Sequence, residues 1–227
     1  DIEKGYEWNW ERAETHYLRA LELNPQCGIA HQWYANLLSI TERHDEALHH
    51  AIQARALEPL SVGPAGFVGY TLFRARNYPE AFHESQGALT LEPDSPIANW
   101  FLGQVLMAMQ RFPEAAHAFS IAVKHSRDAS MYLAALARAC AASGDAQRAA
   151  EMQLSLQHRA QERYVSPLDL AIVAMALGQL DVAFAHLDTA AEQRVMRLTE
   201  LRMPMFDVLP RDSRYQALIA RIGLPGK

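Results

Sequence analysis

The chain has 227 residues, of which 50% are hydrophobic and 21% are charged, and its formal net charge is −5. This composition excludes an intrinsically disordered chain. No apolar run approaches the roughly 18 residues that a membrane-spanning helix needs, so we expect no membrane association. Residues 1–193 carry 14 basic and 23 acidic side chains, whereas residues 194–227 carry seven basic and three acidic ones. Because nucleic-acid binding depends on Lys and Arg side chains that neutralise phosphates, we expect no direct nucleic-acid contact by the acidic part.

A fixed period of 34 residues runs along most of the chain. Alanine marks it in six successive units, and a period of this length predicts a repeat built from one helical hairpin. Gly69 and Gly103 share a further position, where a small residue predicts a close approach of two helix backbones. The six alanines are Ala13, Ala47, Ala81, Ala115, Ala149 and Ala183.

The pattern predicts two antiparallel helices in each unit, and hence an all-α fold. The first unit holds only its second helix, Trp10–Leu23, which we expect to end at Asn24 and Pro25. Five complete repeats follow, at residues 28–58, 62–92, 96–124, 129–159 and 167–193.

The turn inside each repeat has its own signal. Gly144 and Gly178 predict a left-handed residue between the two helices of the last two repeats, where glycine adopts that conformation without steric penalty. The same position holds Glu42, Arg76 and Gln110 in the earlier repeats. We expect those three turns to be less favourable.

Residues 194–227 break the period. Pro204 and Pro210 interrupt the helical pattern, and Asp212 is the predicted N-cap of one short amphipathic helix that ends at Gly223. Since a solenoid needs its terminal apolar faces covered, we expect this segment to be a tail that caps the last repeat. Its positive charge also suits a second arrangement, in which the tail folds back onto the acidic repeats.

The repeated residues resemble the tetratricopeptide repeat family. Residues 97–113 read IANWFLGQVLMAMQRFP and are followed by EAAHAFSIAV, which is similar to the two-helix motif of that family. The array takes residues 1–193, as one half repeat plus five repeats. Arg127, in place of a closing proline, and Leu156, in place of a small residue, depart from the pattern. The resemblance implies a right-handed superhelical solenoid of tandem antiparallel helix pairs.

Two short stretches carry a second resemblance. The opening YEWNWERAE and the tail are similar to repeat regions of bacterial winged-helix regulators, adenylate cyclases and serine/threonine kinases. This resemblance implies a cytoplasmic module of a larger bacterial regulatory protein, and the first residue, Asp1, is in keeping with a piece of a longer chain. Cys27 and Cys140 lie about three repeats apart, so we expect both thiols to be reduced, in keeping with the cytoplasm.

The sequence contains no motif of a catalytic, metal or cofactor site. No P-loop, zinc-protease, nucleophile-elbow or dinucleotide-binding signature occurs. The adjacent His49 and His50 point about 100° apart on a helix, and the spacing of Glu46 and His50 has no third ligand near it in sequence. We therefore expect polar histidines on an exposed convex face, no enzyme activity, no cofactor and no metal.

The family resemblance assigns the binding surface to the first helices of successive repeats. In the family these helices line a concave groove that binds extended or helical peptides, so we expect a protein or peptide partner. No lysine falls on these positions, which argues against a clamp for a partner's C-terminal carboxylate. Aromatic and methionine side chains favour an apolar helix or a mixed peptide instead. The predicted partner-binding residues are Gln32, Asn36, Ser39, Tyr70, Phe73, Arg74, Trp100, Gln104, Met107, Met131 and Arg138, and the last repeat adds Leu168, Ile172 and Met175.

Two other functions are alternatives at this point. The apolar face of the first helix lacks the partner helix that a complete repeat supplies. Either residues outside this chain cover it, or a second copy of the chain does so through Trp8, Trp10 and Tyr17, forming a homodimer. The other alternative is a pocket for a small effector inside the superhelix.

Overall fold

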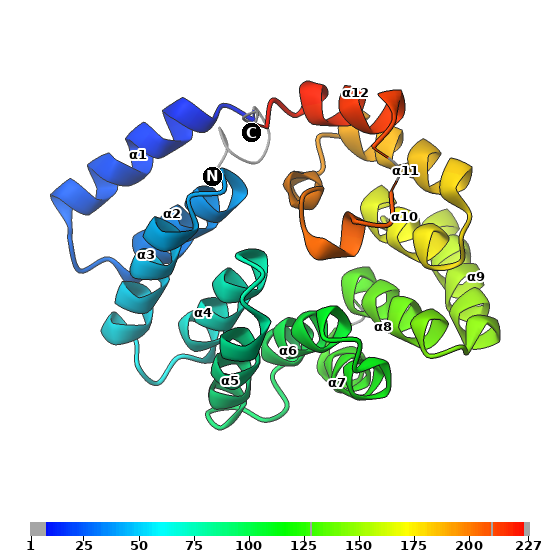
Figure 1. The fold of residues 1–227 in the computed structure, drawn as a ribbon, viewed down its shortest axis with the longest axis horizontal. Helices are drawn as coiled ribbons and strands as arrows, with labels where there is room; N and C mark the ends of the chain where they lie inside the picture. Colours follow the sequence, from blue (N-terminus) through cyan, green and yellow to red (C-terminus); the bar gives the residue numbers. More distant parts are fainter. Residues whose placement is uncertain (1–7, 128, 210, 225–227) are drawn as a thin grey trace.

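The computed structural model describes residues 8–127, 129–209 and 211–224. Over these residues every regular element is helical, with twelve α-helices, two short 3₁₀ helices and no strand. The α-helices follow one another around a ring, and successive helices pack together (Figure 1). The predicted all-α, right-handed superhelical solenoid of antiparallel helix pairs is confirmed.

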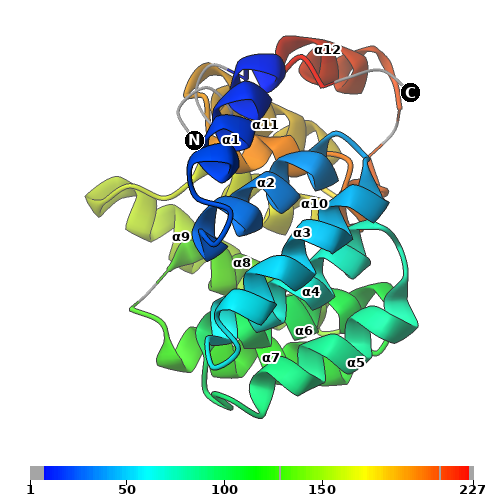
Figure 2. The same ribbon diagram turned by 90° about the vertical axis from the view of Figure 1, so that its left-hand side faces the viewer.

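The repeat array consists of one single helix followed by five helix pairs. The single helix α1, Trp10–Leu23, has the bounds predicted from the sequence. The first helices of the pairs contact one another along the inside of the ring, and the second helices form an outer layer (Figures 1 and 2). The pairs are α2 Gly28–Ile40 with α3 His44–Leu57, α4 Val62–Arg74 with α5 Tyr78–Leu89, α6 Pro96–Ala108 with α7 Phe112–His125, α8 Ser130–Ala142 with α9 Ala146–Glu162, and α10 Pro167–Ala176 with α11 Leu180–Glu192.

Small buried residues set the distance between the two helices of a repeat. The six periodic alanines are all buried, as the 34-residue period predicts. At Gly69 an added Cβ would lie 2.5 Å from Oγ of Ser85 and 3.0 Å from the carbonyl oxygen of Ala81. At Gly103 it would overlap the ring of Phe119. Both positions therefore need glycine, because the second helix of the repeat lies directly against them.

One left-handed residue lies in the turn of each complete repeat. Gly144 and Gly178 have φ angles of 89° and 72°. Glu42, Arg76 and Gln110 take the same position with φ angles of 63°, 62° and 59°. All five turns are thus left-handed at this position, a conformation that is disfavoured for the three residues that carry a Cβ.

The tail leaves the outer layer after α11 and turns into the ring. Two 3₁₀ helices, η2 Met196–Glu200 and η3 Pro204–Phe206, lie inside, and α12, Ser213–Arg221, returns beside α11 (Figure 1). Asp212 caps α12, because its side chain accepts hydrogen bonds from two backbone N–H groups. The sequence does not predict η2 and η3, since such short segments carry no hydrophobic period.

The ring closes where α1 meets the C-terminal end of the tail. Nε1 of Trp10 donates a hydrogen bond of 2.6 Å to the carbonyl oxygen of Gly223. Trp8 and Trp10 are partly buried and pack against the same hydrophobic core as the tail. The sequence offers a second copy or a missing segment as the cover of this face. In the structure, the chain's own C-terminal segment covers part of it.

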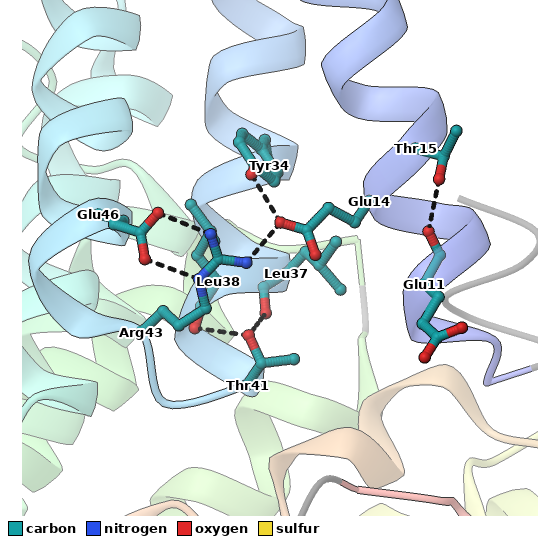
Figure 3. A network of polar contacts seen from close by, with 9 residues as sticks. All are labelled: Glu11, Glu14, Thr15, Tyr34, Leu37, Leu38, Thr41, Arg43 and Glu46. Atoms are coloured by element: carbon teal, nitrogen blue, oxygen red, sulfur yellow. Dashed lines mark hydrogen bonds and ion pairs between the residues drawn. The ribbon is translucent and has the colours of Figure 1, made fainter.

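A polar network holds α1 against the first complete repeat (Figure 3). Glu14 of α1 accepts a hydrogen bond of 2.8 Å from the hydroxyl of Tyr34 and another from Nη1 of Arg43. Arg43 also donates two hydrogen bonds, of 2.7 and 2.6 Å, to Glu46. Burial and the neighbouring Glu14 raise the pKa of Tyr34 to about 12, so its hydroxyl stays a donor at neutral pH. The network joins α1 to both α2 and α3.

Candidate functional site

The inside of the ring, where the predicted groove residues lie, is filled by the tail. Leu198, Leu201, Met203 and Phe206 are each at most 2% exposed. They form one continuous hydrophobic core with side chains of α4, α6, α8 and α10. In the structure α12 packs on α11, while the segment before it occupies the groove. A partner that enters the groove therefore meets the tail.

A cavity of about 260 Å³ lies between the tail and the inner helices. It brings together residues of α2, α4, α6 and α8, and η2 closes it with Arg197 and Glu200 among its side chains. Six of the predicted partner-binding residues line it: Gln32, Asn36, Tyr70, Arg74, Trp100 and Met131.

Aromatic side chains form one wall of this cavity. Tyr70 stacks on Phe101 with ring centroids 4.7 Å apart, and its ring lies 5.5 Å from that of Trp100. The hydroxyl of Tyr70 lies 3.3 Å from Sδ of Met203. Burial and the charge of Glu200 raise the pKa of Tyr70, so the phenol stays neutral. Nε1 of Trp100 is buried and has no hydrogen-bond partner among the described residues, which leaves one unused donor in an apolar wall.

Arg197 is the polar anchor of the tail. Its Nη1 lies 2.9 Å from Oδ1 of Asp169, its Nη2 lies 3.3 Å from Oε2 of Glu200, and its guanidinium lies over the ring of Trp100. Burial lowers the pKa of Arg197, but the carboxylates of Glu200 and Asp169 outweigh burial and raise it above its ordinary value. Asp169 also accepts a hydrogen bond of 2.6 Å from Oγ of Ser130. Arg197 thus joins the tail to α6 and α10.

Gln104 and Arg138 form a second polar pair inside the ring. Nη2 of Arg138 donates a hydrogen bond to Oε1 of Gln104, while its Nε is buried without a partner among the described residues. Burial lowers the pKa of Arg138 to about 10. Arg138 therefore remains a cation at neutral pH, held by a neutral amide.

Burial divides the predicted groove residues into two groups. Phe73 is 1% exposed and packs on Tyr70 with ring centroids 6.0 Å apart, so its side chain belongs to the core. The buried group is Ser39, Tyr70, Phe73, Arg74, Trp100 and Gln104, together with Leu168, Ile172 and Met175 of the last repeat. The partly exposed group is Gln32, Asn36, Met107, Met131 and Arg138.

The tail supplies contacts that sequence reasoning does not predict. Asp207 accepts two hydrogen bonds from Arg76, of 2.7 and 2.9 Å, and Arg214 pairs with Asp181 at 2.8 Å. For the pair of Arg214 and Asp181 the signal in the sequence is the positive charge of residues 194–227 against the acidic repeats, whereas the pair of Asp207 and Arg76 has the opposite polarity and carries no such signal. That signal predicts attraction but does not identify which side chains pair.

Four histidines depart from the expected exposed face, because His31, His44, His50 and His186 are only partly exposed. His49 is exposed, but His50 is half-buried, and its Nδ1 lies 2.8 Å from Nδ1 of His31 on α2. The expectation of solvated histidines is therefore wrong for these four side chains. Among the described residues no three potential metal ligands gather in one place. Cys27 and Cys140 both have free thiols.

Comparison with known proteins identifies the repeats. Two tetratricopeptide repeat models match residues 9–64 and 72–139, which together make up more than half of the chain. The comparison with curated protein sequences gives no significant match. In the part of the chain that the structure describes, no helix has the length and apolar character needed to cross a membrane.

Solved structures share the fold. The crystal structure of PilW, a type IV pilus biogenesis factor, has a TM-score of 0.62 and 19% identity, and the match covers 93% of this chain and 91% of PilW. A tetratricopeptide repeat protein of Thermus thermophilus has a TM-score of 0.63 and 22% identity, over 74% of this chain and 90% of that one. A tetratricopeptide repeat protein from Parabacteroides merdae has a TM-score of 0.63 and 13% identity, and the match covers 94% of this chain and 78% of that one. At such identities the likeness concerns the fold alone, and with the two sequence matches it leads to one conclusion: the chain belongs to the tetratricopeptide repeat family.

Proposed function

We propose that the chain is a non-catalytic protein-interaction module whose groove binds a partner peptide or helix in the place that the tail occupies. The tail itself is the observation that carries this proposal. The inner helices bury Leu198, Leu201 and Phe206 of the tail, so the groove accommodates an apolar segment. A partner with a similar spacing of apolar side chains finds the same aromatic wall at Tyr70 and Trp100.

The setting of the module follows from the weaker resemblance. We place it in the cytoplasm, as part of a larger bacterial regulatory protein whose output domain lies outside this chain. The free, buried thiol of Cys140, whose pKa burial raises, is compatible with a reducing compartment. In this setting the tail competes with the partner, and the affinity of the groove depends on how tightly the tail is held.

A displayed peptide library, selected on the chain, tests the proposal. The affinity of the best peptide is then measured by fluorescence anisotropy for the chain and its variants. Gln32→Ala and Asn36→Ala remove partly exposed groove side chains and are expected to weaken binding. Leu201→Ala removes a fully buried side chain of the tail at a cost of about 2–5 kcal/mol, so it is expected to strengthen binding about tenfold or more.

Leu156→Ala is the matched control for the tail variant. Leu156 is also fully buried but lies on α9, in the outer layer, so its truncation destabilises the repeats without releasing the tail. Equal peptide affinities for the chain, Leu201→Ala and the two groove variants would contradict the proposal.

A further inference from the structure

A second and larger cavity lies beside the groove, where the tail meets the first two complete repeats. Its volume is about 790 Å³, within the range of small-molecule sites. One side consists of the ends of α2 and α4, the turns that follow them and the first residue of α3. The other consists of tail residues before and after η3 and of α12. We call it the seam cavity; its charged or hydroxyl-bearing lining includes Ser39, Glu42, Arg74, Arg76, Arg202 and Arg211.

Both walls of the seam cavity are positively charged. Arg74 and Arg76 come from the repeats, and Arg202 and Arg211 come from the tail. Among the described lining residues, Glu42 is the one carboxylate. Taken as a whole, the tail has a positive net charge and the repeats a negative one, so the two attract each other. The seam cavity is an exception, because arginines lie on both of its walls.

Two carboxylates lie near three of these guanidinium groups. Arg76 and Arg211 share one of them, Asp207, at 2.7 and 3.3 Å. Arg202 lies 3.7 Å from the other, Glu42. Among the described residues the four arginines therefore outnumber these two carboxylates, and an anion placed between the two walls would relieve the repulsion between them.

A buried hydroxyl group also points to a ligand. Ser39 is 2% exposed, lines the seam cavity, and its Oγ has no hydrogen-bond partner among the described residues. A buried polar atom without a partner costs free energy that a ligand oxygen can recover.

We propose that the seam cavity binds a small multivalent oxyanion, with phosphate or carboxylate groups. The planar guanidinium fork matches both groups through paired hydrogen bonds, and the four arginines approach from two sides, which suits an anion with more than one charge. Half of these arginines lie in the tail, so the bound anion joins the tail to the repeats. Arg74 lines both this cavity and the 260 Å³ cavity of the groove, but binding of an anion here does not depend on the function proposed for the groove.

Isothermal titration calorimetry of the whole chain tests this inference, with inorganic pyrophosphate and citrate as the two probes at constant ionic strength. We expect saturable binding of one equivalent of at least one probe, and the better probe distinguishes phosphate from carboxylate. Arg202→Gln and Arg211→Gln are each expected to weaken binding about tenfold or more. Ser39→Ala is expected to weaken it severalfold.

Arg214→Gln is the matched control. The side chain of Arg214 is 45% exposed, as is that of Arg211, but it pairs with Asp181 and Asp212 and does not line the seam cavity. Binding of the better probe by Arg214→Gln should equal that of the unmodified chain. Circular dichroism checks that each variant is folded. If an arginine variant does not fold, the loss of affinity in Ser39→Ala still tests the inference. Heats no larger than those of a sodium chloride titration would overturn the inference. Equal losses of affinity for the better probe in Arg211→Gln and Arg214→Gln would overturn the inference as well.

Discussion

At the scale of single residues, the contact between His31 and His50 determines which tautomer the two neutral rings adopt. Nε2 of His31 lies 3.0 Å from the carbonyl oxygen of Pro25, so this nitrogen carries a hydrogen. In the neutral ring Nδ1 of His31 is then an acceptor, and the hydrogen of the 2.8 Å contact belongs to His50. Burial, followed by the neighbouring His31 and His49, lowers the pKa of His50 to about 4.

This pKa predicts a loss of stability in mild acid. In the unfolded chain the pKa of a histidine is about 6.5, so between pH 6.5 and 4 the unfolded state binds more protons than the folded one. The contribution of His50 to the free energy of unfolding is fully present above pH 6.5 and is lost as the pH drops towards 4. Because the ring is half-buried, we expect a loss of only about 1 kcal/mol.

Urea unfolding at pH 7 and pH 4.5 measures this effect. The His50→Gln variant should lose less stability between the two pH values than the unmodified chain does. The exposed His117 gives the control, since His117→Gln should keep the full pH dependence. The assignment would be wrong if both variants behaved alike.

At the scale of elements, the repeats depend on their left-handed turns. A Cβ built on Gly178 meets nothing within 4 Å, so the effect of a substitution there comes from the backbone alone. Gly87 also has open space around it, but it lies within α5 and has no positive φ angle. The same substitution therefore has opposite consequences at these two positions.

We expect Gly178→Ala to destabilise the chain by about 1 kcal/mol, because alanine disfavours a φ angle of 72°. Gly87→Ala is expected to stabilise it by about 0.5 kcal/mol, since alanine loses less backbone entropy in a helix. Thermal and chemical unfolding of the two variants give the comparison. A shift of the same sign at both positions would show that the turn conformation is not responsible.

The elements also show how far the sequence is informative. The helices of the repeats are predictable because burial of one face imposes a period, and α1 has the predicted bounds. The six groove residues that meet in the 260 Å³ cavity come from the family resemblance, which assigns the binding surface to the first helices of the repeats. The path of η2 and η3 cannot be predicted from the sequence, because the contact of Arg197 with Asp169 depends on the curvature of the whole array. The contact of His50 with His31 is likewise a matter of tertiary packing.

At the scale of the molecule, closing the ring changes which apolar surface is left for another copy of the chain. Trp10 is engaged by the carbonyl oxygen of Gly223, and Trp8 packs against the core. Leu18 and Leu23 of α1 remain 45% and 70% exposed. The homodimer through α1 is therefore left with a smaller apolar surface than the sequence suggests.

We expect light scattering to give the mass of one chain, 25.4 kDa, over a range of micromolar concentrations. A mass of twice this value would identify α1 as an assembly surface. In that case Leu18→Glu should restore the single-chain mass. Glu22→Gln, on the same helix and without an apolar contact to lose, is the control.

The hydrogen bond between Trp10 and Gly223 gives the array a geometric constraint that an open solenoid lacks. In an open solenoid each repeat contacts only its neighbours. Small rotations between repeats therefore add up, and the length of the superhelix changes. With both ends fastened, the rotations around the ring must sum to a fixed value. A rotation at one junction between repeats has to be compensated at another. A displacement of a single outer helix is thus shared among all the junctions between repeats.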